Sequence, residues 1–591
     1  MKAKKDEPKV VSGNIIDFQV LKRLSTYISP YKGRFYFLVF LTIGTAFLAP
    51  IRPIIVSDTI DNYISVGDYE GLVRMIIILV VLLFAQAIFQ YLHTYFSGWI
   101  GQTIIHDLRT KLYKHLLNLQ LRFYDRTPIG RLVTRNVSDI ETLAEVFSQG
   151  LAALIGDVLQ LAVILAAMFW VDWKLTLISL STFPLLILAT YVFKEKIKAS
   201  FNAVRNAVAN LNSFVQERIT GMSIVQIFNS EKREYKKFKA INEEHRKANI
   251  RSVLYYSVYF PVAEIIQALG IGLVVWYGAK GIINDRVEFG DLVAFIMFIQ
   301  MFFRPIRLIA DRFNTLQMGI VSSSRIFKLL DRKDQIPDDG TFSPEKVEGQ
   351  VAFKNVWFAY DDEDYVLKDI SFKVEKGHSL AIVGATGAGK SSIINLLNRF
   401  YDINKGEICV DGHDIKSFNL QSLRQNIGVV LQDVFLFSDT IENNITLGNH
   451  EISRQKIWEA ADLVGARKFI EKLPGGLDYN VMERGATLSV GQRQMISFIR
   501  AMVYDPSIIV LDEATSSVDT ETEELIQSAI EKLMKGRTSV VIAHRLSTIQ
   551  NADTIMVLDK GEIKEMGRHE ELLAKNGFYT QLYQMQYKEV V

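Results

Sequence analysis

Long runs of apolar residues fill much of the first 330 positions of the chain and are absent from the last 250. Six of these runs are long enough to cross a hydrocarbon core of about 30 Å as α-helices. Helices buried inside a large globular protein are the alternative, and six runs of this length disfavour it. We therefore expect an α-helical membrane domain with six transmembrane helices, near residues 35–57, 75–100, 150–171, 174–193, 255–283 and 289–310.

The charges between the runs predict how this domain is oriented. Residues 57–74 carry four acidic residues and one arginine, whereas residues 194–254 carry thirteen Lys/Arg against six Asp/Glu. Residues 101–149 are also basic, with seven Lys/Arg against five Asp/Glu. Because loops rich in Lys and Arg stay in the cytoplasm, we expect the basic segments and both termini to be cytoplasmic.

The two basic segments keep a helical pattern well beyond the thickness of a membrane. A helix rises about 1.5 Å per residue, so these helices should continue tens of ångströms into the cytosol. Each is interrupted, by Pro128 and Gly130 in residues 123–139 and by Gly221 in residues 216–234. A solvated turn is the simpler interpretation. Two similar turns equally far from the membrane instead favour a docking surface for another domain.

Composition changes after the last apolar run. Residues 331–350 are polar with two prolines and two glycines, which predicts a linker between a domain over residues 35–330 and one over residues 351–591. Residues 1–34 form a charged segment that lacks the apolar core of a secretory signal. The net charge of +2 gives no nucleic-acid footprint, and a single cysteine, Cys409, excludes an intrachain disulfide.

An apolar strand, a glycine-rich loop and an apolar helix follow one another in residues 379–400, SLAIVGATGAGKSSIINLLNRF. This order is typical of a phosphate-binding loop, in which backbone N–H groups and a helix N-terminus surround phosphate oxygens. Lys390 should reach the β- and γ-phosphates, and Ser391 should ligate Mg²⁺. We expect an α/β P-loop domain that binds ATP and Mg²⁺ through Gly384, Ala385, Thr386, Gly387, Ala388, Gly389, Lys390, Ser391 and Ser392.

Two later apolar strands end in residues that suit phosphate chemistry. Residues 506–519, PSIIVLDEATSSVD, place Asp512 where it can organise Mg²⁺ and Glu513 where it can polarise an attacking water. Residues 538–548 contain another apolar strand, and it ends at His544, which is positioned to contact a γ-phosphate. Each residue alone could be structural. Their succession after one phosphate loop predicts a hydrolytic site.

Residues 483–495, ERGATLSVGQRQM, read as a loop that opens a helix and faces an anion. With Tyr360, GATGAGKS, Gln432, LSVGQ, LDEATSSVD and His544 in this order, the chain resembles a half-transporter of the ATP-binding cassette (ABC) superfamily, of the bacterial multidrug exporter type. The resemblance covers nearly the whole chain. It implies a cytoplasmic membrane location in a bacterium, a lipid bilayer around the apolar helices, and a second half-transporter as partner.

The resemblance also implies roles for particular residues. Tyr360 would stack on adenine, and Gln432 would sense Mg²⁺ and the attacking water. Asp519 would cross the dimer interface, and residues 483–485 would contact the transverse helices, which match coupling helices near 123–131 and 217–228. The signature loop, which would close over ATP bound to the partner chain, consists of Leu488, Ser489, Val490, Gly491 and Gln492.

Val490 departs from the family pattern, which has glycine at this position and so lets the backbone approach phosphate without a Cβ. The departure affects the partner's ATP site, whereas Lys390, Asp512, Glu513 and His544 are all present in this chain. The resemblance therefore favours a heterodimer with one hydrolytic site and one that mainly holds ATP. A homodimer that tolerates valine remains the alternative.

The resemblance predicts ATP-driven export of hydrophobic or amphipathic small molecules by alternating access. A homodimeric lipid flippase and an ATP-gated channel or regulator are the alternatives, and the acid at Glu513 favours turnover over gating. Charged residues inside membrane spans are functional candidates by default. Asp157 and Glu264 lie deepest, so they could line an aqueous cavity or serve structure alone.

Overall fold

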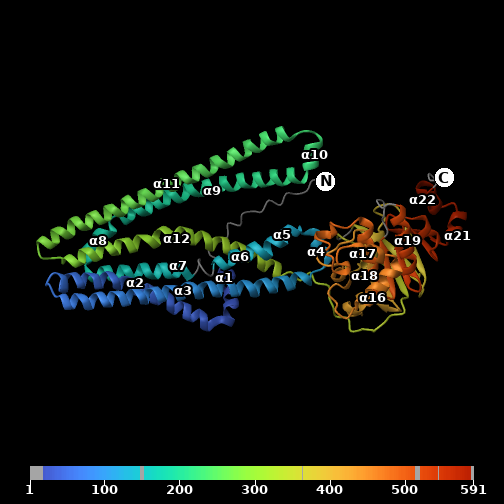
Figure 1. The fold of residues 1–591 in the computed structure, drawn as a ribbon, viewed down its shortest axis with the longest axis horizontal. Coiled ribbons are helices and arrows are strands. Elements are labelled where there is room, and N and C mark those ends of the chain that lie inside the picture. Colours follow the sequence, from blue (N-terminus) through green and yellow to red (C-terminus); the bar gives the residue numbers. More distant parts are fainter. Residues whose placement is uncertain (1–17, 147–151, 362–363, 513–519, 544, 588–591) are drawn as a thin grey trace. The chain divides into compact units, whose positions relative to one another are not determined.

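The computed structural model describes residues 18–146, 152–361, 364–512, 520–543 and 545–587 (Figure 1). It forms two compact units, which are described separately. The first comprises Met1–Leu116 and Ile129–Arg332, and the second comprises Leu117–Pro128 and Lys333–Val591. The short segment 117–128 therefore groups with the second half of the chain, although it follows directly on a helix of the first.

The first unit consists of helices. Its elements are α1 (Phe18–Ile28), α2 (Lys32–Thr59), α3 (Tyr69–Leu117), α5 (Ile129–Thr134), α6 (Ile140–Glu145), α7 (Ala152–Val171), α8 (Trp173–Leu180), α9 (Phe183–Thr220), α10 (Met222–Ile227), α11 (Glu231–Ile283) and α12 (Phe289–Leu330). In the described part of the chain, six helical spans are long and apolar enough to cross a membrane. The prediction of six such helices is confirmed.

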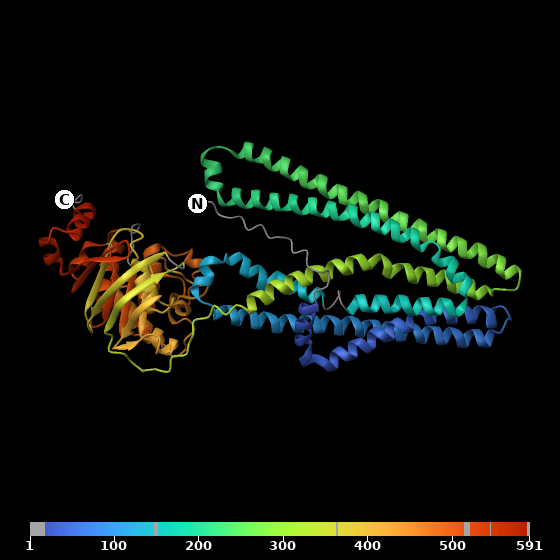
Figure 2. The ribbon, with the colours of Figure 1, turned by 180° about the vertical axis from the view of Figure 1, so that it is seen from behind.

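Helix length explains how this unit reaches beyond a bilayer. Helix α11 has 53 residues, which at about 1.5 Å per residue is more than twice the thickness of a hydrocarbon core. It runs beside α9, and α10 joins the two at their far end (Figures 1 and 2). Ser200 and Ser252 share a hydrogen bond of 2.7 Å between the two helices, and Phe193 stacks on Tyr259 at 4.1 Å.

The membrane part has its own apolar core between α2, α7, α8, α9, α11 and α12. Phe295 and Phe298 of α12 are fully buried in this core, with Ile164 from α7 and Leu175 from α8. The turn before α8 is fixed by Asp172, whose carboxylate accepts the N–H groups of Lys174 and Leu175 at 2.7 and 2.8 Å. This N-cap satisfies donors that a helix start would otherwise leave unpaired.

The second unit contains two sheets, visible as arrows in Figure 2. An antiparallel sheet has the order β2-β1-β4-β5, and a mostly parallel sheet has the order β10-β9-β3-β8-β7-β6. The strands are β1 (Val351–Ala359), β2 (Tyr365–Val374), β3 (Ser379–Val383), β4 (Lys405–Val410), β5 (His413–Asp414), β6 (Ile427–Val430), β7 (Ile508–Asp512), β8 (Thr538–Ile542), β9 (Thr554–Asp559) and β10 (Glu562–Gly567).

Helices flank these sheets, and the predicted α/β class is confirmed. They are α4 (Leu121–Arg126), α13 (Lys390–Leu397), α14 (Leu420–Gln425), α15 (Ile441–Thr446), α16 (Arg454–Val464), α17 (Arg467–Lys472), α18 (Val490–Val503), α19 (Thr520–Met534), α20 (Leu546–Gln550), α21 (His569–Ala574) and α22 (Phe578–Tyr587). One core lies around β1–β4 and α13, and a second lies around α16, α18 and α19. Residues 348–350 lie between α12 and β1, and their N–H groups donate hydrogen bonds of 2.6 to 3.0 Å to the carboxylate of Asp411.

Candidate nucleotide-binding site and its connections

The phosphate loop leaves the central strand β3 and enters α13. Two of its glycines are required by close contacts. A Cβ on Gly384 would lie 2.0 Å from the carbonyl oxygen of Leu558, and one on Gly389 would lie 2.7 Å from Leu367. Gly389 also has φ of +104°, a left-handed conformation that favours glycine. These contacts hold the loop tightly over the sheet edge, so that its N–H groups and the start of α13 face one small region.

Lys390, the first residue of α13, is buried, and its ammonium group folds back on the loop. The Nζ atom donates to the carbonyl oxygens of Gly384 and Ala385 at 2.8 and 3.0 Å. Burial lowers the pKa of Lys390, and the nearby Asp512 carboxylate opposes this shift. Ser391, one residue later, is exposed at the same helix start. A cationic donor, a hydroxyl and a carboxylate at one helix N-terminus fit a nucleotide triphosphate with Mg²⁺.

The parallel register brings the predicted strand-end residues to one edge. Strands β3, β8, β7 and β6 are neighbours and run in the same direction. The phosphate loop follows β3, Asp512 ends β7, and the exposed Gln432 follows β6 by two residues. In parallel sheets, ligands bind at the carboxyl ends of the strands. Glu513, Asp519 and His544 lie outside the described residues.

Tyr360 follows β1 and joins the phosphate loop to the segment 117–128. Its hydroxyl hydrogen-bonds with Ser392 at 3.1 Å, and its ring meets that of Tyr401 edge-on at 5.1 Å. Its backbone carbonyl accepts from Arg122 and from Arg126, the latter at 2.9 Å. Arg122 and Arg126 belong to α4, so this short helix is bonded directly beside the expected adenine position.

A second contact fixes α4 at the same place. Asp125 accepts a hydrogen bond from the hydroxyl of Tyr401. Burial and this hydrogen bond together raise the pKa of Tyr401 above its ordinary value. Arg126 also pairs with Asp361. The predicted docking stretch around residue 123 is thus held by two arginines and an aspartate, none of which the sequence interpretation had singled out.

The signature loop forms a capped helix start. The Ser489 hydroxyl accepts the N–H of Gln492 at 3.2 Å, and the Gln492 side chain accepts the N–H of Ser489 at 3.0 Å. This reciprocal capping box starts α18. Arg493 supports the loop by donating to the Leu488 carbonyl oxygen at 2.8 Å. The spacing of Ser489 and Gln492 was visible in the sequence, and the sequence interpretation did not use it.

Val490 is the first residue of α18, and its side chain is 48% exposed. Its backbone is helical, so the position does not need the left-handed freedom of glycine. Any effect of the valine therefore comes from its branched side chain at the helix N-terminus, where an anion from another chain would approach. The neighbouring Gly491 is buried.

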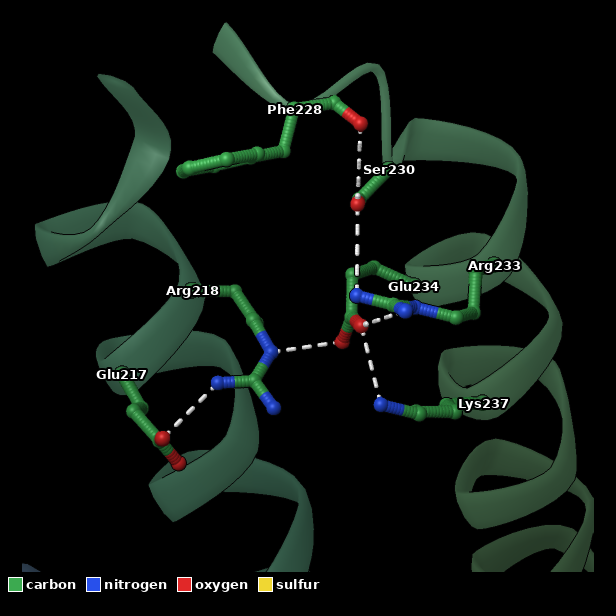
Figure 3. A network of polar contacts seen from close by, with 7 residues as sticks. All are labelled: Glu217, Arg218, Phe228, Ser230, Arg233, Glu234 and Lys237. Carbon is green, nitrogen blue, oxygen red and sulfur yellow. Dashed lines mark hydrogen bonds and ion pairs between the residues drawn. The ribbon is translucent and has the colours of Figure 1, made fainter. Parts of the chain in front are cut away.

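The tip of the α9–α11 hairpin, residues 217–237, contains a network of ion pairs (Figure 3). The Glu234 carboxylate accepts from Arg218 Nε at 2.6 Å and from Lys237 Nζ at 2.9 Å, and it lies 3.4 Å from Arg233 Nε. Arg233 also donates to Ser230 at 3.2 Å. Hydrogen bonds from Lys237 and Arg218 lower the pKa of Glu234 to about 2. The network joins α9 to α11 on either side of α10.

The hairpin tip combines this polar network with exposed apolar side chains. Ile224 and Ile227 of α10 are 62% and 72% exposed, and Phe228 is 73% exposed. Contiguous exposed apolar side chains of this kind mark interaction sites. Gly221, which the sequence flagged as a break, forms the C-cap of α9 and the N-cap of α10.

The two acids inside the membrane part have different surroundings. Asp157 of α7 lies 3.6 Å from Arg312 of α12, and both side chains are at most about a quarter exposed. This ion pair gives Asp157 a partner inside the protein and favours a structural role. Glu264 of α11 is exposed. The sequence assigned Asp157 and Glu264 the same candidate role, whereas in the structure Asp157 is paired and Glu264 is exposed.

Comparison with known proteins agrees with this arrangement. A family model described as "ABC transporter transmembrane region" matches residues 35–306, and one described as "ABC transporter" matches residues 367–516. The chain is 39% identical over 572 residues to the "Uncharacterized ABC transporter ATP-binding protein YknV" of Bacillus subtilis (strain 168), covering 96% of this chain and 95% of the relative.

Two further relatives have names that mention a substrate. The "Probable multidrug resistance ABC transporter ATP-binding/permease protein YheH" of Bacillus subtilis (strain 168) is 38% identical, covering 88% of this chain and 77% of the relative. The "ATP-dependent lipid A-core flippase" of Syntrophus aciditrophicus (strain SB) is 35% identical, covering 96% of this chain and 95% of the relative.

Proposed function

Because the chain belongs to the ABC transporter family, we propose that it exports amphipathic small molecules across a bacterial cytoplasmic membrane as one half of a dimer. It is a multi-pass membrane protein whose ATP hydrolysis is coupled to transport. In the proposed topology both termini and the nucleotide-binding domain are cytoplasmic, and the loops at 57–74, 171–174 and 281–290 face outward. The basic segments 101–149 and 194–254 support this topology.

The observation that carries the proposal is the bonding of α4 to Tyr360. Only three residues separate the end of the membrane helix α3, at Leu117, from the start of α4. Arg122 and Arg126 hold α4 to the backbone beside the phosphate loop. A movement at the nucleotide edge is therefore transmitted to α3 through a very short connection, as a transporter driven by ATP requires.

Residues of the chain have distinct parts in the proposed hydrolysis. Lys390 leaves the carbonyl oxygens of its own loop and neutralises charge on the β- and γ-phosphates. Glu513 orients and polarises the attacking water, and His544 contacts the γ-phosphate. Ser391, Asp512 and Gln432 would hold Mg²⁺, which would supply positive charge to neutralise the phosphates. The Tyr360 ring stacks on the adenine.

Alternating access follows from a difference in ATP affinity between open and closed dimers. ATP shifts the pair toward the closed state only by as much as it binds that state better. In the proposed dimer, each signature loop and Asp519 face the partner's ATP. The apolar hairpin tip, with Ile224, Ile227 and Phe228, docks on the partner's nucleotide-binding domain. Hydrolysis then returns the pair to its open state.

We further propose that the dimer is a heterodimer with unequal ATP sites. The exposed branched side chain of Val490 is presented to the partner's site, while this chain's own phosphate loop keeps Lys390 and the acid at Glu513. Half-transporters of this type act as dimers. Affinity capture from native membranes followed by native mass spectrometry tests the composition, and recovery of self-pairs alone would exclude the heterodimer.

Export is tested with inside-out vesicles that contain the chain. Wild-type vesicles should accumulate a fluorescent amphiphile when ATP is added, and vesicles with Glu513→Gln should bind ATP without accumulating it. Equal accumulation by both would contradict the proposed catalytic role of Glu513. A lipid flippase is the second candidate, because one relative carries that name. ATP-dependent movement of a labelled lipid, without uptake of the amphiphile, would favour it.

A further inference from the structure

The exposed side of α11 carries two different strips of residues within the membrane part. The first strip is apolar and follows the three-to-four-residue spacing of one helix face. Its members are 38% to 74% exposed: Leu254, Val258, Val262, Ile265, Leu269 and Trp276. From Leu254 to Trp276 the helix rises about 33 Å, close to the thickness of a hydrocarbon core. This strip has the length and character of a lipid-facing surface.

The second strip lies about 140° further around the helix axis and contains three polar side chains and one aromatic ring. Ser257, Phe260, Glu264 and Gln267 also recur every three or four residues, so they share a face. Ser257, Phe260 and Glu264 are exposed, and Gln267 is half-buried. Glu264 lies about 15 Å along the helix from Leu254 and about 18 Å from Trp276. Its carboxylate is therefore close to the middle of the apolar strip.

A carboxylate at this depth is costly unless it faces water or an opposite charge. Among the described residues, none forms an ion pair or hydrogen bond with Glu264, whereas Asp157 has Arg312 at 3.6 Å. The middle of the face that carries Glu264 is thus polar and exposed, and no cation among the described residues pairs with this carboxylate. These properties fit a surface that lines a solvated path through the membrane and do not fit contact with lipid.

Aromatic rings lie next to this carboxylate on the same helix. Phe260 is one turn from Glu264 and stacks on Tyr256, with ring centroids 5.9 Å apart. Tyr256 in turn contacts Phe193 of α9 edge-on at 5.3 Å. Phe260 itself is 46% exposed. Aromatic faces attract cations as well as apolar groups, and a neighbouring carboxylate adds direct charge recognition.

We propose that Glu264 selects amphipathic substrates that carry a positive charge, binding the cationic group while Phe260 contacts the apolar body. This inference rests on the proposed export function and names the substrate class of its translocation path. Glu264 contributes a charge that a neutral substrate cannot use. Its removal should therefore weaken cation binding selectively, which a purely structural role would not do.

Direct binding tests the inference without requiring transport. The full chain, with any partner that co-purifies, is placed in lipid nanodiscs without ATP. Equilibrium dialysis then measures tetraphenylphosphonium, a lipophilic cation, and triphenylphosphine oxide, a neutral molecule of similar aromatic character. Glu264→Gln should weaken tetraphenylphosphonium binding about tenfold and leave triphenylphosphine oxide within about twofold. Glu264→Asp, which keeps the charge, should restore most of the lost affinity.

The matched control is Glu244→Gln, which removes an exposed carboxylate from the cytoplasmic part of the same helix. It should leave both affinities unchanged. Equal weakening of both probes by Glu264→Gln, no weakening of the cation, or no binding of the cation by wild type would each overturn the inference. Charge-selective binding without ATP-dependent uptake in vesicles would instead refute the proposed export and leave the inference in place.

Discussion

Arg218 near the end of α9 donates a 2.6 Å hydrogen bond from Nε to Oε2 of Glu234 in the first turn of α11 (Figure 3). The two residues lie on opposite sides of α10, so their bond closes the hairpin tip. Lys237 donates to the same carboxylate at 2.9 Å. One nearly buried acid therefore organises cations from both helices and fixes the apolar side chains of α10 in place.

Replacing Glu234 should uncouple transport from ATP hydrolysis. In Glu234→Gln, the cations Arg218, Lys237 and Arg233 lose their shared counter-charge, so the tip loosens and transmits movement poorly. We expect transport per ATP hydrolysed to fall severalfold while ATP binding is retained, measured in proteoliposomes. Glu231→Gln, which alters an exposed acid in the same helical turn, should leave this ratio unchanged. A similar fall in both variants would argue against the network.

The pKa of Glu234 sets how this network depends on pH. A carboxyl whose pKa falls on folding adds stability that is complete above its ordinary value of 4.5 and is lost as the pH falls toward about 2. Amide protection at residues 222–234, corrected for intrinsic exchange rates, should thus be constant between about pH 7 and pH 5. Glu234→Gln should show low protection throughout. A loss of wild-type protection within this range would contradict the assignment.

The bonds from α4 to Tyr360 should carry the signal between nucleotide and membrane. Arg126→Gln removes a donor to the Tyr360 carbonyl and the pairing with Asp361. We expect the stimulation of ATPase activity by an amphiphile to fall, because α4 is then held only by Arg122 and Asp125 and passes movements of α3 to the site less well. Arg131→Gln, at an exposed position five residues later, is the control. Full stimulation in Arg126→Gln would show that Arg126 is dispensable for coupling.

Lys390 should dominate the affinity for ATP. Lys390→Met removes the only side-chain ammonium within the phosphate loop, residues 384–391. Hydrogen bonds from a cation to phosphate are strong, so ATP affinity should fall on the order of a hundredfold, about 2.8 kcal/mol. A fluorescent ATP analogue measures it. Lys405→Met, which removes an exposed ammonium at the start of β4, should bind ATP with wild-type affinity. Comparable ATP affinity in both variants would refute the role of Lys390.

Val490→Gly isolates the effect of the branched side chain. The valine is half exposed at the start of α18, so its removal should change stability by no more than about 0.5 kcal/mol. We expect ATPase activity at the partner's site to rise, because the helix N-terminus becomes more accessible to phosphate. Val490→Ala, which keeps the Cβ, should give a smaller gain. Unchanged activity in both variants would mean that the loop tolerates valine.

The sequence predicted features whose cause is local. Apolar runs of membrane length and the GATGAGKS loop each depend on neighbouring residues. The described part of the chain contains six membrane-length helices and a loop between β3 and α13. The capping box of Ser489 and Gln492 was also readable from its spacing. The pairing of Arg218 with Glu234 was not, because it depends on how α9 and α11 align after the turn at α10.

Contacts between residues far apart in the sequence could not be predicted either. Asp157 meets Arg312 across 155 positions, and Arg122 reaches Tyr360 across 238. Charge alone could not tell that Asp157 has a partner while Glu264 has none among the described residues. For Val490, the sequence located the departure from the family pattern. Only the structure showed that the backbone there is helical and that the side chain is exposed.

The unequal pairing of ATP sites is tested most directly by the ATPase activity of this chain purified alone in lipid nanodiscs, beside its Glu513→Gln variant. The heterodimer predicts little turnover from the chain alone and full turnover when the half-transporter captured from native membranes is added. Full turnover from the chain alone, abolished by Glu513→Gln, would contradict it. That result would mean that two copies of this chain form a working pair despite Val490.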